Sequence, residues 1–210
     1  MRKLMVVALA ALLAVVVAGP VAAGANVSNT SGSALAAEGS WYTDGPDGYA
    51  FGYVSAWQEQ GASAAFIQFY SDAGAKVDCT PADPTDDAYG FVGSYRFGYG
   101  TGTLAVGRGY GSAAASGSVD IYGADIDDCA GTWLDVYEPG APVSFDLTAT
   151  GPKVMARGTW SFHIPSQFNS HSSYSSTYRI ASGTATIGDG ELTTIDGAIG
   201  KVSWRDHSNG

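Results

Sequence analysis

The chain has 210 residues, of which 45% are hydrophobic, 12% aromatic and only 14% charged. This composition is too hydrophobic and too aromatic for a disordered chain. Twenty acidic residues outnumber ten basic ones, which gives a formal net charge of −10 and argues against a nucleic-acid partner, because phosphate binding needs a basic surface. The length suits one domain.

The N-terminus has the pattern of an export signal. Arg2 and Lys3 precede an unbroken apolar run over residues 4–18, and small residues up to Ala25 fit a cleavage site. Fifteen apolar residues fall short of the roughly 20 that span a bilayer, so an uncleaved anchor is the less favoured alternative. We therefore predict a secretory signal peptide over residues 1–25 and a protein that is extracellular or in the cell envelope, without membrane insertion after cleavage.

The predicted mature chain would be strongly acidic. It keeps eight basic and twenty acidic residues, a net charge of −12, which favours solubility and disfavours adhesion to anionic surfaces. Asn26 and Asn29 each begin a glycosylation sequon, which matters only in a host that glycosylates.

Two cysteines, Cys79 and Cys129, are present, and both lie in the predicted exported part. Two thiols in an oxidising compartment usually pair. A bridge that closes a loop of about 50 residues stabilises a chain by roughly 4 kcal/mol. We predict a Cys79–Cys129 disulfide.

Alternation of apolar and polar residues predicts an all-β fold. Residues 26–40 are rich in small polar residues and are predicted to be a flexible lead-in to a single β domain over residues 41–207. Within that domain the period of two is typical of antiparallel strands with one buried face. We expect a monomer built from a meander of about ten strands, closed into a barrel or folded into a two-sheet sandwich, with the barrel slightly favoured. The predicted strands are 49–57, 64–71, 90–99, 102–107, 117–123, 132–137, 143–149, 153–164, 177–188 and 197–204.

Aromatic residues form a stripe along each of two predicted strands. In each stripe the aromatic residues alternate with small or polar ones, so their side chains share a face. One interpretation is that the rings fill the core; the other is that they form a surface for a carbohydrate or a small amphipathic ligand, since tyrosine suits a half-wet face. The candidate ligand-binding residues are Tyr49, Tyr53, Trp57, Tyr89, Tyr95 and Tyr99.

Acidic residues cluster on both sides of the predicted disulfide. The bridge would draw them together, and a calcium ion, which takes six to eight oxygen ligands, would relieve their repulsion. The alternative is a solvated acidic edge, and no other cofactor is expected. The candidate calcium ligands are Asp83, Asp86, Asp87, Asp125, Asp127 and Asp128.

No catalytic motif is apparent. The three histidines, His163, His171 and His207, have no recognised zinc spacing, and there is no nucleophile elbow or phosphate loop. We predict a binding module without catalytic chemistry. The alternatives are a structural or surface-interaction protein whose aromatic residues are core and, least favoured, a secreted hydrolase that would need a histidine in contact with a nucleophile and a carboxylate.

Overall fold

A computed structural model describes residues 28–209 of the chain, except residues 47, 81–87, 165–167 and 191–192. The predicted signal peptide and the sequon at Asn26 lie outside the described residues, so these remain predictions. The described part is almost entirely β-strand, with one short 3-10 turn.

Eight strands follow one another along the chain. They are β1 (Ser28–Gly45), β2 (Gly48–Glu59), β3 (Ala65–Asp78), β4 (Tyr89–Val106), β5 (Ser112–Asp127), β6 (Thr132–Ile164), β7 (Phe168–Ile187) and β8 (Thr193–Asn209). The 3-10 turn η1 (Arg108–Tyr110) separates β4 from β5.

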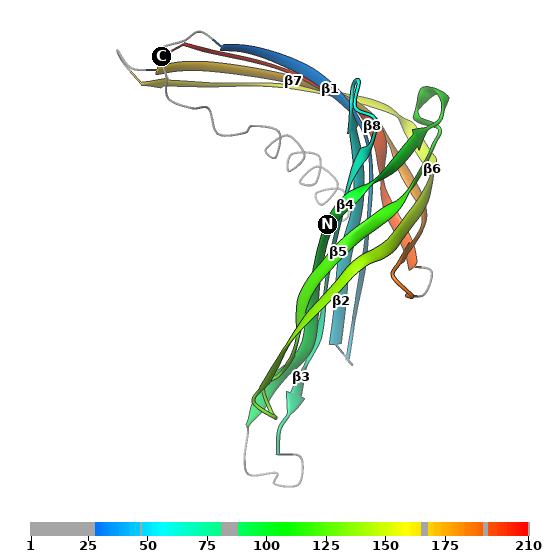
Figure 1. Cartoon of the computed structure of the whole chain (residues 1–210), viewed down its shortest axis with the longest axis vertical. Coiled ribbons are helices and arrows are strands. Elements are labelled where there is room, and N and C mark those ends of the chain that lie inside the picture. Colours follow the sequence, from blue (N-terminus) through cyan, green and yellow to red (C-terminus); the bar gives the residue numbers. More distant parts are fainter. Residues whose placement is uncertain (1–27, 47, 81–87, 165–167, 191–192, 210) are drawn as a thin grey trace.

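Each strand pairs antiparallel with the next, and β8 returns to pair with β1, so that the meander closes into a barrel (Figure 1). Closure removes the sheet edges that would otherwise template aggregation. The predicted all-β antiparallel fold is confirmed, with a barrel rather than a sandwich, but the strand number is eight and not ten.

Two long strands account for the excess in the predicted number, since they replace five predicted strands, while β1 was not predicted as a strand. The predicted strands 90–99 and 102–107 are one strand, β4, and the predicted strands 132–137, 143–149 and 153–164 are one strand, β6. Pro139 with Gly140, and Gly151 with Pro152, interrupt the alternation of β6 and lie at two irregularities in its pairing. A bulge accommodates such residues without ending a strand.

One of these irregularities lies where the pairing of β5 with β6 shifts register, between Val119 and Ile121. Gly140 of β6 has a φ of 67° there, a conformation that favours glycine. Its N–H donates to Oδ1 of Asp120 at 2.8 Å, so a side chain takes the place of the missing ladder partner.

The prediction of a flexible lead-in over residues 26–40 is wrong for residues 28–40, which belong to β1. This strand contains many alanines, glycines and serines and few β-branched residues, so its own propensity is low. It forms because β2 lies on one side of it and β8 on the other, and both pair with its backbone.

The core fills the inside of the barrel. Eight strands leave an interior just wide enough for side chains to occupy, and the residues that point inward are mostly alanine, valine, isoleucine and leucine. Phe145 of β6 is 1% exposed and is the largest of the fully buried side chains. Tyr110 of η1 has a φ of 61° and packs against the same cluster. The interior formed by the described residues is therefore a packed core.

The strands are longer than the barrel and extend beyond it at both ends (Figure 1). We call one extension the upper arm; it consists of residues 28–35, 153–164, 168–179 and 201–209, and it bends away from the barrel. We call the other the lower arm; it consists of residues 72–78, 89–95, 122–127 and 132–138.

The predicted disulfide is confirmed: Cys79 and Cys129 are bonded, with their Cα atoms 5.1 Å apart. Cys79 follows β3 and Cys129 follows β5, so the bridge joins the two neighbours of β4 and passes across that strand at Gly90. A Cβ atom on Gly90 would lie 2.8 Å from Sγ of Cys79 and 3.0 Å from Sγ of Cys129. Glycine is needed at this position because the bridge lies against the backbone.

Candidate functional site

The two predicted aromatic stripes lie on the outside of the barrel. In β2 the even-numbered Val54 and Ala56 are buried in the core, so the odd-numbered residues of that strand point outward. In β4, Gly98 and Leu104 are buried, which again directs the odd-numbered residues outward. The interpretation that these stripes fill the core is therefore wrong.

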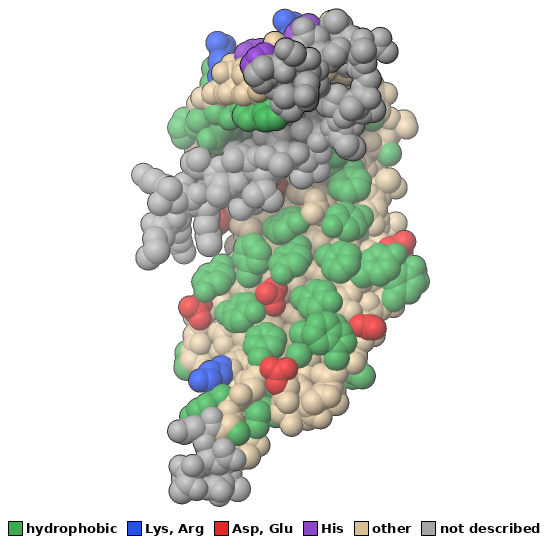
Figure 2. All heavy atoms as spheres, turned by 90° about the vertical axis from the view of Figure 1, so that its left-hand side faces the viewer, with side chains coloured by type: hydrophobic (Ala, Val, Ile, Leu, Met, Phe, Trp, Pro, Cys, Tyr) green, Lys and Arg blue, Asp and Glu red, His purple; other side chains and the backbone are tan. Residues whose placement is uncertain are grey.

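The stripes join into a larger set of rings that we call the aromatic surface. β3 lies between β2 and β4. β5 and β6 continue the surface beyond β4 and onto the lower arm, where Tyr95, Tyr122, Trp133 and Tyr137 lie. Figure 2 shows hydrophobic side chains spread over one face, with single carboxylates between them. The aromatic surface consists of Phe51, Tyr53, Trp57, Phe66, Tyr70, Tyr95, Phe97, Tyr99, Tyr122, Trp133 and Tyr137.

Within this surface the rings contact one another in an unbroken series across five strands. Trp57 lies 5.8 Å from Phe66, and Phe66 lies 6.0 Å from Tyr99, between ring centroids. From Tyr99 the series continues through Phe97 and Tyr122 to Tyr137, with centroids 4.9 to 6.0 Å apart. Such contacts hold the rings in fixed positions before any ligand arrives, because each side chain supports the next.

The six predicted ligand-binding residues do not all lie in that series. Trp57 and Tyr99 belong to it, while Tyr53 stacks on Tyr70 at 5.8 Å and Tyr95 contacts Trp133 at 6.1 Å.

The other two predicted residues have partners of their own. Tyr49 donates its hydroxyl to Asp72 at 3.1 Å, and the ring of Tyr89 is covered by the ammonium of Lys76 at 4.0 Å from its centroid. We therefore centre the candidate site on the rings between Trp57 and Tyr137.

Polar groups lie between the rings. Gln68 donates to the hydroxyl of Tyr53 at 2.6 Å, and the indole N–H of Trp133 donates to Asp135 at 3.1 Å. The charge of Asp120 raises the pKa of Tyr137, and desolvation raises the pKa of Tyr53. Both phenols therefore stay protonated at neutral pH and can donate hydrogen bonds.

The outer surface of the barrel is polar at the ends of β5 and β6 nearest the upper arm. The outward residues there are three serines, a threonine and an aspartate, all of them exposed: Ser116, Ser118, Ser144, Asp146 and Thr148. The aromatic surface is thus bounded by polar residues on this side.

Seven members of the aromatic surface were not among the candidate ligand-binding residues. Phe51 and Phe97 lie in the two predicted stripes, whereas the other five lie outside them: Phe66, Tyr70, Tyr122, Trp133 and Tyr137. Each lies in a predicted strand or next to one, and the alternation of β3 marked Phe66, Gln68 and Tyr70 as one face. The missing information was the register, because only the pairing of strands shows that these faces adjoin.

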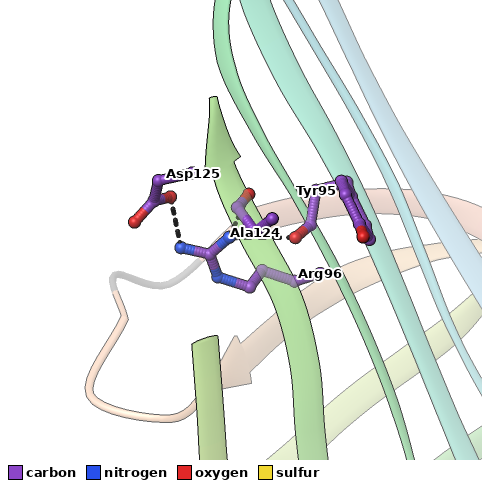
Figure 3. A network of polar contacts seen from close by, with 4 residues as sticks. All are labelled: Tyr95, Arg96, Ala124 and Asp125. Atoms are coloured by element: carbon purple, nitrogen blue, oxygen red, sulfur yellow. Dashed lines mark hydrogen bonds and ion pairs between the residues drawn. The ribbon is translucent and has the colours of Figure 1, made fainter. Parts of the chain in front are cut away.

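Where the structure describes them, the carboxylates near the disulfide have hydrogen-bond or ion-pair partners within the protein. Asp125 forms an ion pair with Arg96, with Nη2 and Oδ1 2.5 Å apart (Figure 3). Asp127 accepts from the N–H of Ala130 at 2.9 Å, and Asp128 accepts from the N–H of Phe91 at 3.0 Å.

No group of three or more potential metal ligands occurs among the described residues. Three of the predicted calcium ligands, Asp83, Asp86 and Asp87, lie outside that part of the chain, and calcium remains an untested prediction.

The histidines lie in the upper arm. Nδ1 of His171 is 2.8 Å from Oγ of Ser161, and Nδ1 of His207 is 2.6 Å from Oδ1 of Asn29. On the described face that carries these four side chains, strand alternation places no carboxylate to complete a Ser-His-Asp arrangement. The absence of catalytic chemistry remains a prediction.

Comparison with known proteins does not place the chain in a family. No family model and no curated protein matches it. Among solved structures, Neisserial surface protein A is similar over 88% of this chain and 98% of that chain, with 11% sequence identity and a TM-score of 0.23. At this level of likeness neither family nor function follows. None of the described residues forms a helix long and apolar enough to cross a membrane.

Proposed function

We propose that this protein is a non-catalytic carbohydrate-binding module and that the aromatic surface holds an extended polysaccharide. The observation that supports this most is the unbroken series of rings from Trp57 to Tyr137 on the outside of the barrel. Tyr99 is 48% exposed and Tyr137 is 59% exposed, so their rings are open to a partner.

The chemistry of the surface favours a sugar over a purely apolar ligand. Aromatic rings stack on the C–H faces of pyranose units, and the hydroxyls of tyrosine and the carboxylates of Asp120 and Asp135 bond to sugar hydroxyls. An apolar ligand would have to cover these polar groups without bonding to them, at a cost of about 1–3 kcal/mol for each group left unpaired. A sugar polymer leaves none of them unpaired.

Binding to insoluble neutral polysaccharides tests the proposal. Cellulose and chitin present arrays of pyranose faces, and depletion of the protein from solution measures its affinity for them. We expect Tyr99→Ala combined with Tyr137→Ala to weaken binding by roughly two- to tenfold per ring, since one aromatic contact contributes about 0.5–1.5 kcal/mol. Trp160→Ala is the control, because Trp160 is equally exposed but lies in the upper arm.

Retained melting temperature in all variants would exclude unfolding as the cause of any loss. Equal binding by the wild type, the double variant and the control would contradict the proposal, and so would failure of the wild type to bind either polymer.

A further inference from the structure

The upper arm has one face on which basic residues gather. Five of the eight basic residues after residue 25 lie on this arm, in a molecule with a large acidic excess. Figure 2 shows lysine, arginine and histidine side chains together at the top of the molecule, where the arm lies. The arm residues concerned are Lys153, Arg157, Arg179, Lys201 and Arg205, together with His163, His171 and His207.

Strand register shows that these residues share one face. Arg157 pairs across the sheet with Ser175, which pairs with Ser203, which pairs with Ser33. The row beside it, farther from the barrel, consists of Thr159, Ser173, Arg205 and Ser31, and the row on the other side contains Lys201. All carry odd numbers, as do the inward residues of the barrel in these strands, so the basic face continues the inner face of the barrel wall.

The basic face is hollowed. A groove of about 800 Å³ is lined by residues of β1, β6, β7 and β8 and by Gln60 at the turn after β2. Arg157, Lys201 and Arg205 line it together with five serines and a threonine. The rows are about 7 Å apart, so the three cationic side chains are spaced along the groove, one per row, instead of being crowded at one point.

Among the residues that the structure describes, no carboxylate forms an ion pair with any of these three cations. Glu59 and Asp206 lie close in sequence and structure, but Glu59 is paired with Ala34 and Asp206 with Thr30, and strand alternation places both on the opposite face. By contrast with these three cations, Arg179 donates a hydrogen bond to the carbonyl of Gly151 at 2.8 Å and so stabilises the fold.

We infer that the groove of the upper arm is a binding site for an acidic polysaccharide, a sugar polymer that carries carboxylate or sulfate groups. Guanidinium groups bind such oxyanions with two parallel hydrogen bonds. The serine and threonine hydroxyls both donate and accept, which suits the sugar hydroxyls between the charged groups. This site is separate from the aromatic surface and does not depend on what that surface binds.

The same observations disfavour a nucleic acid. Double-stranded DNA carries one charge per roughly 1.7 Å of helix axis, whereas the groove offers one cation per row. Single strands are held by rings on which bases stack. Tyr174 and Trp204 are among the residues that line the groove, but strand alternation directs their side chains, like that of Trp160, to the opposite face of the arm. The contact of Trp204 with Gly32 on that face agrees with this placement.

Binding of sodium polygalacturonate, a carboxylated sugar polymer, to the purified protein tests the inference, with dextran as the neutral polymer and a DNA duplex as the phosphate polymer. We expect the wild type to bind polygalacturonate more tightly than dextran, and to lose this preference as salt is raised. Replacing Arg157→Gln and Arg205→Gln together should weaken binding by roughly tenfold or more, because each charge-assisted bond contributes about a factor of ten.

The matched control is Lys76→Gln with Arg108→Gln, which removes the same charge from exposed positions outside the arm. It should leave the affinity within about twofold, since exposed charges at a distance are screened. Equal weakening in both double variants would overturn the inference, as would tighter binding of DNA than of polygalacturonate, or no binding of polygalacturonate at low salt.

Tyr99→Ala with Tyr137→Ala should lower only the binding that persists at high salt or with dextran, and should leave the salt-dependent preference for polygalacturonate in place. The two proposals can therefore be tested separately.

Discussion

At the scale of single residues, Arg96 shows that a charged side chain can stabilise a fold mainly through backbone contacts. Its guanidinium donates to the carbonyl of Tyr95 at 2.9 Å and to the carbonyl of Ala124 at 2.8 Å, besides pairing with Asp125 (Figure 3). Arg96→Met should lower the free energy of unfolding by about 1–3 kcal/mol, because two carbonyls lose a charged donor. Asp125→Asn should cost less than about 1 kcal/mol, since that carboxylate is half exposed and screened.

Urea unfolding of both variants at low and high salt checks this difference. The effect of Asp125→Asn should shrink with salt, while that of Arg96→Met should persist. Equal losses in the two variants would show that the ion pair, rather than the carbonyl contacts, provides the stabilisation.

At the scale of elements, the passage of the disulfide across β4 couples three strands of the lower arm. Gly90→Ala would place a methyl group about 3 Å from both sulfurs, so either the bridge or the strand must shift. We expect a loss of about 1–3 kcal/mol in the free energy of unfolding, the usual cost of overpacking, and slower formation of the disulfide in a thiol titration.

The cause of that loss can be isolated with a double-mutant cycle. In a Cys79→Ser/Cys129→Ser background the smaller oxygen atoms are not bonded to each other and can move aside. Gly90→Ala should then cost much less. An undiminished loss would mean that the methyl group conflicts with something other than the bridge.

At the scale of the whole molecule, the barrel separates a buried core, which stabilises the fold, from an outer face that we propose binds a ligand. Phe145→Ala should destabilise the protein by about 3–5 kcal/mol, as removal of a buried aromatic ring does. Tyr99→Ala should cost only about 1 kcal/mol, because half of that side chain is already exposed and only its ring contacts are lost.

Thermal unfolding distinguishes these two cases, with a drop in melting temperature on the order of 10 °C for Phe145→Ala and only a few degrees for Tyr99→Ala. Similar drops in melting temperature for both variants would mean that the aromatic surface contributes to stability as much as a buried ring does. That result would weaken its assignment as a binding surface.

Much of the fold is predictable from the sequence because alternation and cysteine number are local signals. The runs around Val143, Phe145 and Leu147 show the period of two, and the structure buries these three residues as expected. The strand β1 is not predictable in the same way, since its alanines and glycines give it no strand propensity of its own and only pairing with β2 and β8 forms it.

The side of the barrel on which the aromatic stripes lie could not be decided from the strands alone. A strand that alternates tyrosine with valine, alanine or glycine can bury either face, and ring size suggests that the aromatic face is inside. The width of an eight-stranded barrel decides the matter, because its interior accommodates small and branched side chains but not rows of large rings. The basic groove could not be predicted from the sequence for a related reason. Arg157 and Arg205 are 48 positions apart, and only the register of the strands places them in neighbouring rows.

The pairing of β1 with β8 has a consequence for when the protein can form. Residue 28 lies opposite residue 208, so the last seam of the barrel joins segments about 180 positions apart along the chain. Any chain that emerges N-terminus first, from a ribosome or through a translocation pore, must wait for β8 before this seam can close. Until then β1 has an unpaired edge, and contacts of such long separation form slowly. The architecture therefore delays completion of the barrel until almost the entire polypeptide has been delivered.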